Sequence, residues 1–342
     1  MQNSVPGHDI IVIGASAGGV EALSQLVAGL PPRLKASVFV VLHMPAESTS
    51  ALPRILSVCG PLPVVHATDH LRIEQGCIYV APPDHHLLLE PGQMRVVKGP
   101  KENRHRPAVD PLFRSAAQAY GPRVIGVILT GSLNDGTSGL WAVKQRGGIA
   151  VVQDPAEAHF PSMPQSAIAY APVDYVVPLS QMAALLSRLV DKRAAEDPPG
   201  DAPRYMSNEV SRAAMEQNDI NEQRMLETPT LYTCPECGGV LWELHEGNLA
   251  HFRCRIGHVY TLEALLAQQD EMLEAALWRT RNTLEEKANL TERLIEQTRQ
   301  HSHEQEVTRL EEKLHQIRQH LMLLTQVPLE DEEDMQENQT HP

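Results

Sequence analysis

Near its beginning the sequence reads Ile10-Ile-Val-Ile-Gly-Ala-Ser-Ala-Gly-Gly-Val-Glu-Ala-Leu23. The unbroken apolar run at residues 10–13 predicts a strand buried on both faces, and the residues after the glycines predict a helix. Ser16 therefore lies on a tight strand-to-helix turn, for which the glycines leave room. A serine presented in the pattern Gly-x-Ser-x-Gly is typical of a nucleophile elbow.

The same turn is open to a second interpretation as a phosphate-binding turn of a doubly wound fold. Against this, Ser16 stands where the second glycine of Gly-x-Gly-x-x-Gly is needed. No Gly-Lys-Ser/Thr follows either, so the sequence does not match a P-loop. From these residues alone, a nucleophilic serine and a purely structural turn both remain open.

The composition indicates a protein with at least one large aliphatic core. Of 342 residues, 42% are hydrophobic and only 4% aromatic, and the length allows two domains. No apolar run approaches the roughly 20 residues that cross a bilayer, so we expect a cytoplasmic protein without membrane insertion. The five cysteines are an odd number, which favours a reducing compartment over a disulfide framework.

The net charge of −14 lies in the second part of the chain. Residues 1–190 carry 14 Lys and Arg against 13 Asp and Glu, whereas residues 191–342 carry 15 against 30. This distribution leaves no basic surface for nucleic acid, and the acidic excess is typical of a solvated helical tail.

Short aliphatic runs alternate with helical patterns through residues 1–193, which predicts one α/β domain. The fold class expected is a doubly wound, mainly parallel, Rossmann-like sheet with helices on both faces. Strands are predicted at 9–14, 37–43, 63–66, 76–81, 123–130, 149–153 and 174–178, a small hairpin at 84–98, and helices at 19–29, 48–58, 109–120, 136–146, 163–170 and 180–192.

A Pro-rich and polar linker is expected at 194–228, with a loose helix at 207–226, and a small metal-binding unit at 229–260. Cys234-Pro-Glu-Cys237 and Cys254-Arg-Ile-Gly-His258 supply two ligand pairs of zinc-ribbon spacing. His251 and His245 compete with His258 for the fourth position. The segments at 240–244 and 250–254 predict a two-stranded ribbon between the pairs. So small a unit needs its structural zinc to fold.

The last part of the chain predicts helices followed by a disordered acidic tail. Residues 261–327 hold few Gly or Pro, and leucines recur in a heptad-type pattern. The polar interval 297–306 leaves open a helical hairpin or one long coiled coil. Residues 328–342 form the tail.

Two further polar residues follow predicted strands. His43 ends the run Val40-Val-Leu-His43, and Asp135 follows the strand that ends near Leu129. Because parallel strands present their carboxyl ends at one edge of a sheet, Ser16, His43 and Asp135 are expected to meet there. A serine, a base and an orienting carboxylate make a nucleophilic triad.

Four motifs in this order resemble the catalytic domain of CheB, the chemotaxis protein-glutamate methylesterase. They are Gly14-Ala-Ser-Ala-Gly-Gly19, Leu42-His-Met-Pro45, Arg106-Pro-Ala-Val-Asp-Pro-Leu-Phe-Arg-Ser-Ala-Ala117 and Leu129-Thr-Gly-Ser-Leu-Asn-Asp-Gly136. The resemblance covers residues 9–190. It implies a Ser16–His43–Asp135 triad in an order different from that of α/β-hydrolases.

The activity implied by the resemblance is hydrolysis of methyl esters on glutamate side chains of chemoreceptor helices, with deamidation of glutamine as a second activity. The backbone N–H groups of Ala17 and Ser132 would donate hydrogen bonds to the oxyanion. No cofactor would be needed for catalysis. The alternative is a catalytically silent scaffold that recruits partners through the zinc unit and the helices.

The sequence departs from the family pattern in three respects. Ala17 and Ser132 stand where the family usually has Thr and Met, which puts substrate preference in doubt. The phosphorylatable receiver domain that usually precedes the esterase is missing, so we expect no control by phosphorylation in cis. The C-terminal extension is instead expected to dock on or regulate the esterase, or to mediate a homodimer or partner docking through its helices.

Overall fold

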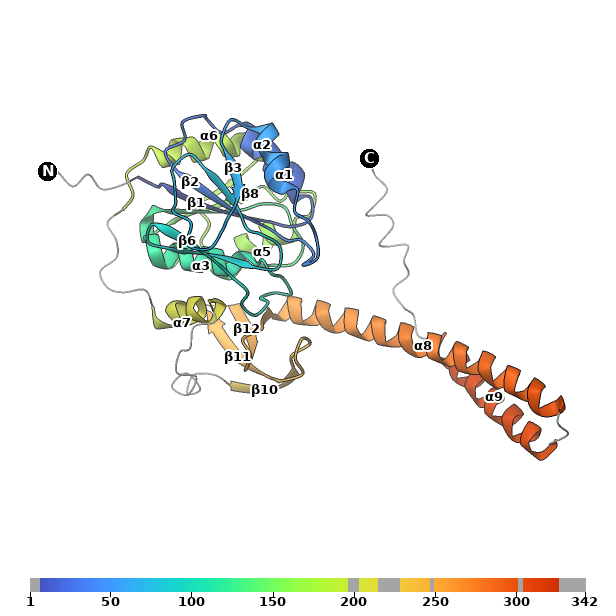
Figure 1. Ribbon diagram of the computed structural model, residues 1–342. Helices are drawn as coiled ribbons and strands as arrows, with labels where there is room; N and C mark the ends of the chain where they lie inside the picture. Colours follow the sequence, from blue (N-terminus) through green and yellow to red (C-terminus); the bar gives the residue numbers. More distant parts are fainter. Residues whose placement is uncertain (1–6, 196–202, 215–227, 247–248, 301–303, 326–342) are drawn as a thin grey trace. The chain divides into compact units, whose positions relative to one another are not determined.

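The strand Ile10–Ala15 (β1) lies at the centre of a seven-stranded parallel sheet in the computed structural model of the chain (Figure 1). The strand order is β3-β4-β2-β1-β7-β8-β9. The structure describes residues 7–195, 203–214, 228–246, 249–300 and 304–325. The other strands of this sheet are β2 (Ser37–Leu42), β3 (Val64–His66), β4 (Ile78–Val80), β7 (Val124–Ile128), β8 (Ile149–Gln153) and β9 (Tyr175–Val177).

Helices cover both faces of the sheet, as the alternating sequence pattern predicts (Figure 1). The helices are α1 (Gly19–Ala28), α2 (Leu52–Cys59), α3 (Val109–Tyr120), α4 (Thr137–Gln145), α5 (Ser162–Tyr170) and α6 (Leu179–Val190), with a 3₁₀ turn, η1, at Gly121–Arg123. The predicted hairpin is β5 (His86–Glu90) paired with β6 (Gln93–Val97). Each strand and helix predicted for residues 9–192 is present, with ends that differ by a few residues.

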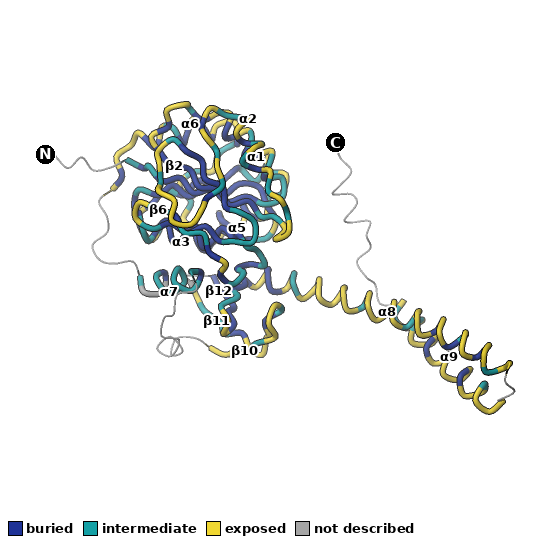
Figure 2. The backbone as a smooth tube through the Cα atoms, in the orientation of Figure 1, coloured by how far each residue is buried: buried dark blue, intermediate teal, exposed yellow. Residues whose placement is uncertain are grey.

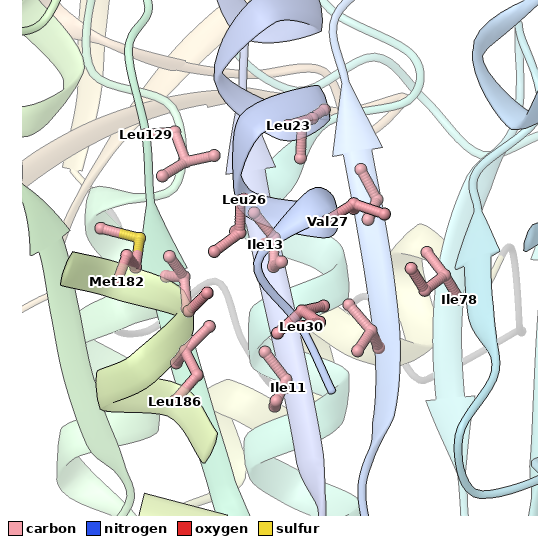
Figure 3. Packing of buried hydrophobic residues seen from close by; sticks show 14 of the residues in the cluster. Ile11, Ile13, Leu23, Leu26, Val27, Leu30, Ile78, Leu129, Met182 and Leu186 are labelled. Atoms are coloured by element: carbon pink, nitrogen blue, oxygen red, sulfur yellow. The ribbon is translucent and has the colours of Figure 1, made fainter. Parts of the chain in front are cut away.

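Alternate residues of β1 belong to two separate cores. Ile11 and Ile13 pack with α1 and α6 on one face, where Leu26 and Leu186 are also fully buried (Figure 3). Val12 points to the opposite core, formed with α3, α4 and α5. Because β1 is buried on both sides, its residues have to be apolar without alternation.

A second sheet follows the helix α7 (Arg204–Ala213), and it is larger than the two-stranded ribbon predicted. The predicted strands are present as β11 (Val240–Glu246) and β12 (Leu249–Cys254), and β10 (Thr228–Thr233) and β13 (Val259–Thr261) flank them in an antiparallel sheet of order β10-β11-β12-β13. Most of the predicted helix at 207–226, and the predicted disordered tail, lie outside the described residues.

The described residues up to Leu265 form one compact unit, and those from Leu266 onward form another. The second unit contains most of α8 (Leu262–Gln300) and all of α9 (Glu304–Leu324). Leu310, Leu314 and Ile317 of α9 pack against Ala288 and Ile295 of α8. Of the two arrangements left open by the sequence, these contacts correspond to a helical hairpin. Most of the α8 surface is exposed (Figure 2).

Candidate active site

Ser16 lies immediately after β1, at the carboxyl edge of the sheet. Its backbone N–H donates to the carbonyl of Thr130 at 3.0 Å, and the N–H of Gly19 donates to its carbonyl at 2.9 Å. Gly18 adopts φ 69° at the N-terminus of α1, a left-handed conformation that glycine takes without strain. These bonds hold Ser16 against the extension of β7, next to the point where the strand order reverses.

His43 occupies the equivalent position after β2. Ala15 pairs with Leu42 in the parallel register, and the N–H of His43 donates to the Ala15 carbonyl at 3.1 Å, so residues 16 and 43 are the next pair at the edge. The Nε2 atom of His43 is 2.7 Å from Oδ2 of Asp135. Its Nδ1 atom is buried and, among the described residues, has no hydrogen-bond partner. This arrangement leaves Nδ1 available to accept a proton when Nε2 carries the hydrogen.

Asp135 is buried beneath His43, where several donors surround its carboxylate. The N–H of Val109 donates to Oδ2 at 2.6 Å, and the N–H of Gly136 and the Nδ2 of Asn103 each donate to Oδ1 at 3.0 Å. Burial alone would raise the pKa of Asp135, but the hydrogen bonds and the charge of His43 outweigh it and lower the pKa below its usual range. Asp135 is therefore an anion in contact with the imidazole of His43.

A second carboxyl group, Asp110, lies beside Asp135 and shares the same amide. Asn103 Nδ2 donates to Oδ2 of Asp110 at 3.0 Å, and the N–H of Gly139 donates to its Oδ1 at 2.6 Å. Burial, together with the negative charge of Asp135, raises the pKa of Asp110 well above its usual value. Two neighbouring carboxyl groups thus have opposite shifts, and Asp135 is the ionised one.

Two residues that sequence reasoning missed, His105 and Asn103, also contact His43 and Asp135. The ring of His105 stacks on that of His43, with centroids 3.6 Å apart and planes inclined by 11°. Burial, with the proximity of His43, lowers the pKa of His105 to about 3, so its ring is neutral. Asn103 is the other. Both lie in an irregular segment between β6 and α3, where no periodicity or spacing motif marks them.

A pocket of about 520 Å³ opens at this edge, and Ser16, Ala17 and His43 form part of its wall. Cationic side chains of Lys101, Arg104 and Arg106 also line it. Arg106 pairs with Asp84 at 2.5 Å, and Lys101 pairs with Glu236 at 2.6 Å.

The two residues predicted to supply oxyanion donors differ in position. Ala17 lines the pocket beside Ser16, whereas Ser132 is an exposed residue of the loop after β7. The neighbouring Gly131 is packed so closely that a Cβ atom there would lie 2.8 Å from the Cβ of Ser16. The loop after β7 therefore approaches Ser16 through a position that only glycine fits.

The predicted metal ligands come together in the second sheet. The potential ligand atoms of Cys234, Cys237, Cys254 and His258 all lie within 4.8 Å of one another. His251 and His245 are not members of this cluster among the described residues.

Three of the six separations within the cluster have the lengths expected of a tetrahedral site. The Sγ atoms of Cys237 and Cys254 are 3.6 Å apart, and Nδ1 of His258 lies 3.6 Å from Cys234 Sγ and 3.5 Å from Cys254 Sγ. Ligands at the usual Zn–S and Zn–N distances are separated by about 3.5–3.8 Å along the edges of a tetrahedron. The residues present therefore fit a closed zinc site.

The fold and this edge of the sheet define a class of protein: a doubly wound α/β domain that gathers a serine, a histidine and a buried aspartate at its topological switch point. Residues 11–186 match the family model described as CheB methylesterase. That match covers more than half of the sequence, and the chain belongs to the CheB methylesterase family.

Individual relatives agree with this assignment. A putative protein-glutamate methylesterase/protein-glutamine glutaminase of Leptospira interrogans is 40% identical over 183 residues, which make up 53% of this chain and 95% of that protein. The protein-glutamate methylesterase/protein-glutamine glutaminase of Pyrococcus abyssi is 37% identical over 192 residues, or 55% of this chain and 52% of the relative.

A solved structure extends the likeness to the fold. The crystal structure of the Thermotoga maritima CheB methylesterase catalytic domain is 37% identical, with a TM-score of 0.51, and the match covers 53% of this chain and 98% of that one. In the part of the chain that the structure describes, none of the helices has the length and apolar character needed to cross a membrane.

Proposed function

We propose that the chain is a serine hydrolase that removes methyl groups from the γ-methyl esters of glutamate side chains. The observation that carries the proposal is the buried contact between His43 Nε2 and Asp135 Oδ2 at 2.7 Å. His43 follows β2, the strand that pairs with β1, and Ser16 follows β1. Membership of the CheB methylesterase family supports the same reaction. The substrates proposed are methylated chemoreceptors or related signalling proteins, as the resemblance to the chemotaxis methylesterases implies, and the relatives are named as methylesterases that act on protein glutamate.

In the first half of the proposed reaction, His43 Nδ1 accepts the proton of Ser16 while Oγ attacks the ester carbonyl carbon. The carbonyl electron pair moves to oxygen, and the backbone N–H groups of Ala17 and Ser132 are the proposed donors to this oxyanion. When the intermediate collapses, the proton on Nδ1 passes to the leaving methoxide. Methanol departs, and the glutamyl group remains esterified to Ser16.

Water completes the cycle. His43 Nδ1 takes a proton from the water as its oxygen attacks the acyl-enzyme, and returns that proton to Ser16 as the free glutamate leaves. Asp135 stays ionised throughout, because its pKa is depressed, and stabilises the protonated imidazole. No step requires a cofactor. Deamidation of glutamine would follow the same path with ammonia as the leaving group.

Methanol release from a methylated receptor tests the proposal. We expect Ser16→Ala to lower kcat/KM by about 10³-fold or more, because the nucleophile is lost. Ser57→Ala, which changes an exposed serine of α2, is the matched control and should remain within about twofold of the parent chain. Equal methanol release from the parent chain and Ser16→Ala would remove the esterase assignment.

The catalytically silent scaffold is the alternative. It predicts that the parent chain releases no more methanol than Ser16→Ala, yet still binds partners through its C-terminal part. The buried and fully hydrogen-bonded carboxylate of Asp135 favours the enzyme, since a buried charge is costly and a scaffold gains nothing from it.

We also propose that Cys234, Cys237, Cys254 and His258 hold a structural zinc ion. The ion would supply cross-linking within the sheet β10–β13, whose apolar core consists of few residues. It takes no part in the ester chemistry.

For the exposed part of α8 we propose a second copy of the chain as the partner. Leu266 and Leu273 are 58% and 61% exposed, and they continue the heptad-type pattern that is buried further along in the hairpin. Sedimentation equilibrium should find a dimer that Leu273→Glu dissociates. A monomer at micromolar concentration would exclude this partner and leave docking of a different protein.

A further inference from the structure

Asn103 donates a side-chain hydrogen bond to the Asp135 carboxylate, which also contacts the ring of His43. Asn103 is 2% exposed and adopts φ 47°, in the left-handed region that non-glycine residues rarely occupy. Such a conformation persists only where neighbouring contacts fix it. Those contacts come from the sheet that carries the Cys/His cluster.

Strand β13 binds Asn103 on two sides. The N–H of Asn103 donates to the carbonyl of Val259 at 2.8 Å, and the N–H of Thr261 donates to the side-chain Oδ1 of Asn103 at 3.1 Å. Because Oδ1 faces this donor, Nδ2 has to face Asp110 and Asp135. The backbone N–H of Thr261 thus fixes the orientation of the Asn103 amide, so that its Nδ2 donates to the carboxylate of Asp135.

The same threonine also holds the residue that precedes Asp135. The hydroxyl of Thr261 donates to Oδ1 of Asn134 at 2.8 Å, and Nδ2 of Asn134 donates to Oε2 of Glu263 at 2.8 Å. Thr261 is 1% exposed, and its Oγ1 accepts from the N–H of Ala264 at the start of α8. The loop that ends in Asp135 is therefore tied to β13 and the first turn of α8.

Strand β13 begins directly after the second pair of metal ligands. The N–H of Cys254 donates to the carbonyl of His258 at 3.0 Å, and Val259 is the next residue. A cluster that fixes Cys254 and His258 therefore fixes the start of the strand that contacts Asn103.

We propose that Thr261 and Asn103 are positioning residues for the Asp135 carboxylate, through which the Cys/His unit aligns the imidazole of His43. The inference rests on the proposed esterase function. The family match covers residues 11–186, and Thr261 lies outside it. In this arrangement, residues outside the match complete the hydrogen-bond shell of a site that lies inside the match. Misplacing a catalytic group by about 1 Å costs up to about 10²-fold in rate, so we expect effects of about 10- to 100-fold.

The test uses the full chain with Asn103→Gly, which removes the amide without backbone strain, and with the pair Thr261→Val and Thr261→Ser. Valine removes the hydroxyl that binds Asn134 at nearly constant shape and keeps the backbone N–H that binds Asn103, whereas serine retains both contacts. We expect Asn103→Gly and Thr261→Val to lower kcat about 10- to 100-fold with KM within about twofold, and Thr261→Ser to restore kcat. Unchanged kcat in both Asn103→Gly and Thr261→Val would overturn the inference.

A second readout does not depend on turnover. The Nε2 proton of His43, bonded to Asp135, should give a downfield NMR signal that is absent in His43→Gln. We expect Asn103→Gly, and chelation of the metal from the parent chain, to shift or broaden this signal. An unaltered signal in both cases would contradict the inference. This readout is independent of methanol release, so it also distinguishes a failure of the inference from a failure of the esterase assignment. Thermal melts would identify a variant that has not folded.

Discussion

The parallel sheet and the Cys/His unit differ in what holds them together. The sheet has a core on each face, and residues such as Ile11 and Leu26 are completely buried. The unit has a core of Leu241, Phe252 and Tyr260 with a few smaller residues, alongside four potential metal ligands. Burial grows with domain size, so the larger region can rely on the hydrophobic effect, while the smaller one needs cross-links.

Removing the metal is the strongest way to break this comparison. Structural zinc contributes about 10–16 kcal/mol of binding free energy in zinc-finger peptides, so we expect chelation or Cys254→Ser to unfold the unit. Elemental analysis should find one zinc per parent chain. Hydrogen exchange should show loss of protection in 228–261, while the amides of β1 and β7 stay protected.

Cys59→Ser provides the control for this experiment, because Cys59 is a half-buried thiol at the end of α2, outside the cluster. It should retain the zinc and the protection of 228–261. If Cys254→Ser bound zinc as the parent chain does, or kept the same protection, the unit would not depend on the metal.

A smaller effect is the pH dependence of stability that we expect from the parallel-sheet region. His105, at the sheet edge, has a pKa of about 3 in the folded chain against an ordinary value of 6.5. Between these values the unfolded chain binds a proton that the folded chain does not. Stability from this group is therefore lost as the pH falls, by up to about 1.4 kcal/mol per pH unit.

His105→Asn removes the titrating imidazole and with it this pH-dependent contribution to stability. The difference in unfolding free energy between parent and variant should therefore shrink as the pH falls from 6.5 towards 4. Denaturant unfolding at several pH values measures the difference, in which the contributions of unaltered groups cancel. His86, which is fully buried and has a pKa of about 4, should give the same sign when changed to Asn. A difference independent of pH would mean that His105 is not held neutral.

The parallel sheet could be predicted because its residues obey a short-range rule. A buried strand such as β1 needs an unbroken apolar run, and the glycines after it mark the turn, so the positions of Ser16 and His43 at strand ends, and of Asp135 in the loop after β7, follow from local sequence. That Cys234, Cys237, Cys254 and His258 come together was also predictable, because the Cys-x-x-Cys and Cys-x-x-x-His pairs have a spacing typical of metal sites.

What sequence reasoning could not supply are contacts between segments far apart in the chain. Asn103 and Thr261 are separated by 158 positions, and neither stands in a periodic pattern or a spacing motif. Strand β13 was missed because three residues are too few for an alternation to be read. In β10, Pro229 argues against a strand, and the residue is tolerated because β10 lies at the edge of its sheet.

The serine and the histidine are joined by the ladder of the sheet itself, through the bond from the His43 N–H to the Ala15 carbonyl. The spacing of their backbones is consequently inherited from the geometry of the sheet. An exposed residue of the pocket wall such as Ala46 could therefore be exchanged without moving the backbones of Ser16 and His43. Such a scaffold allows the substrate preference of the proposed esterase to be retuned while Ser16 and His43 keep their places.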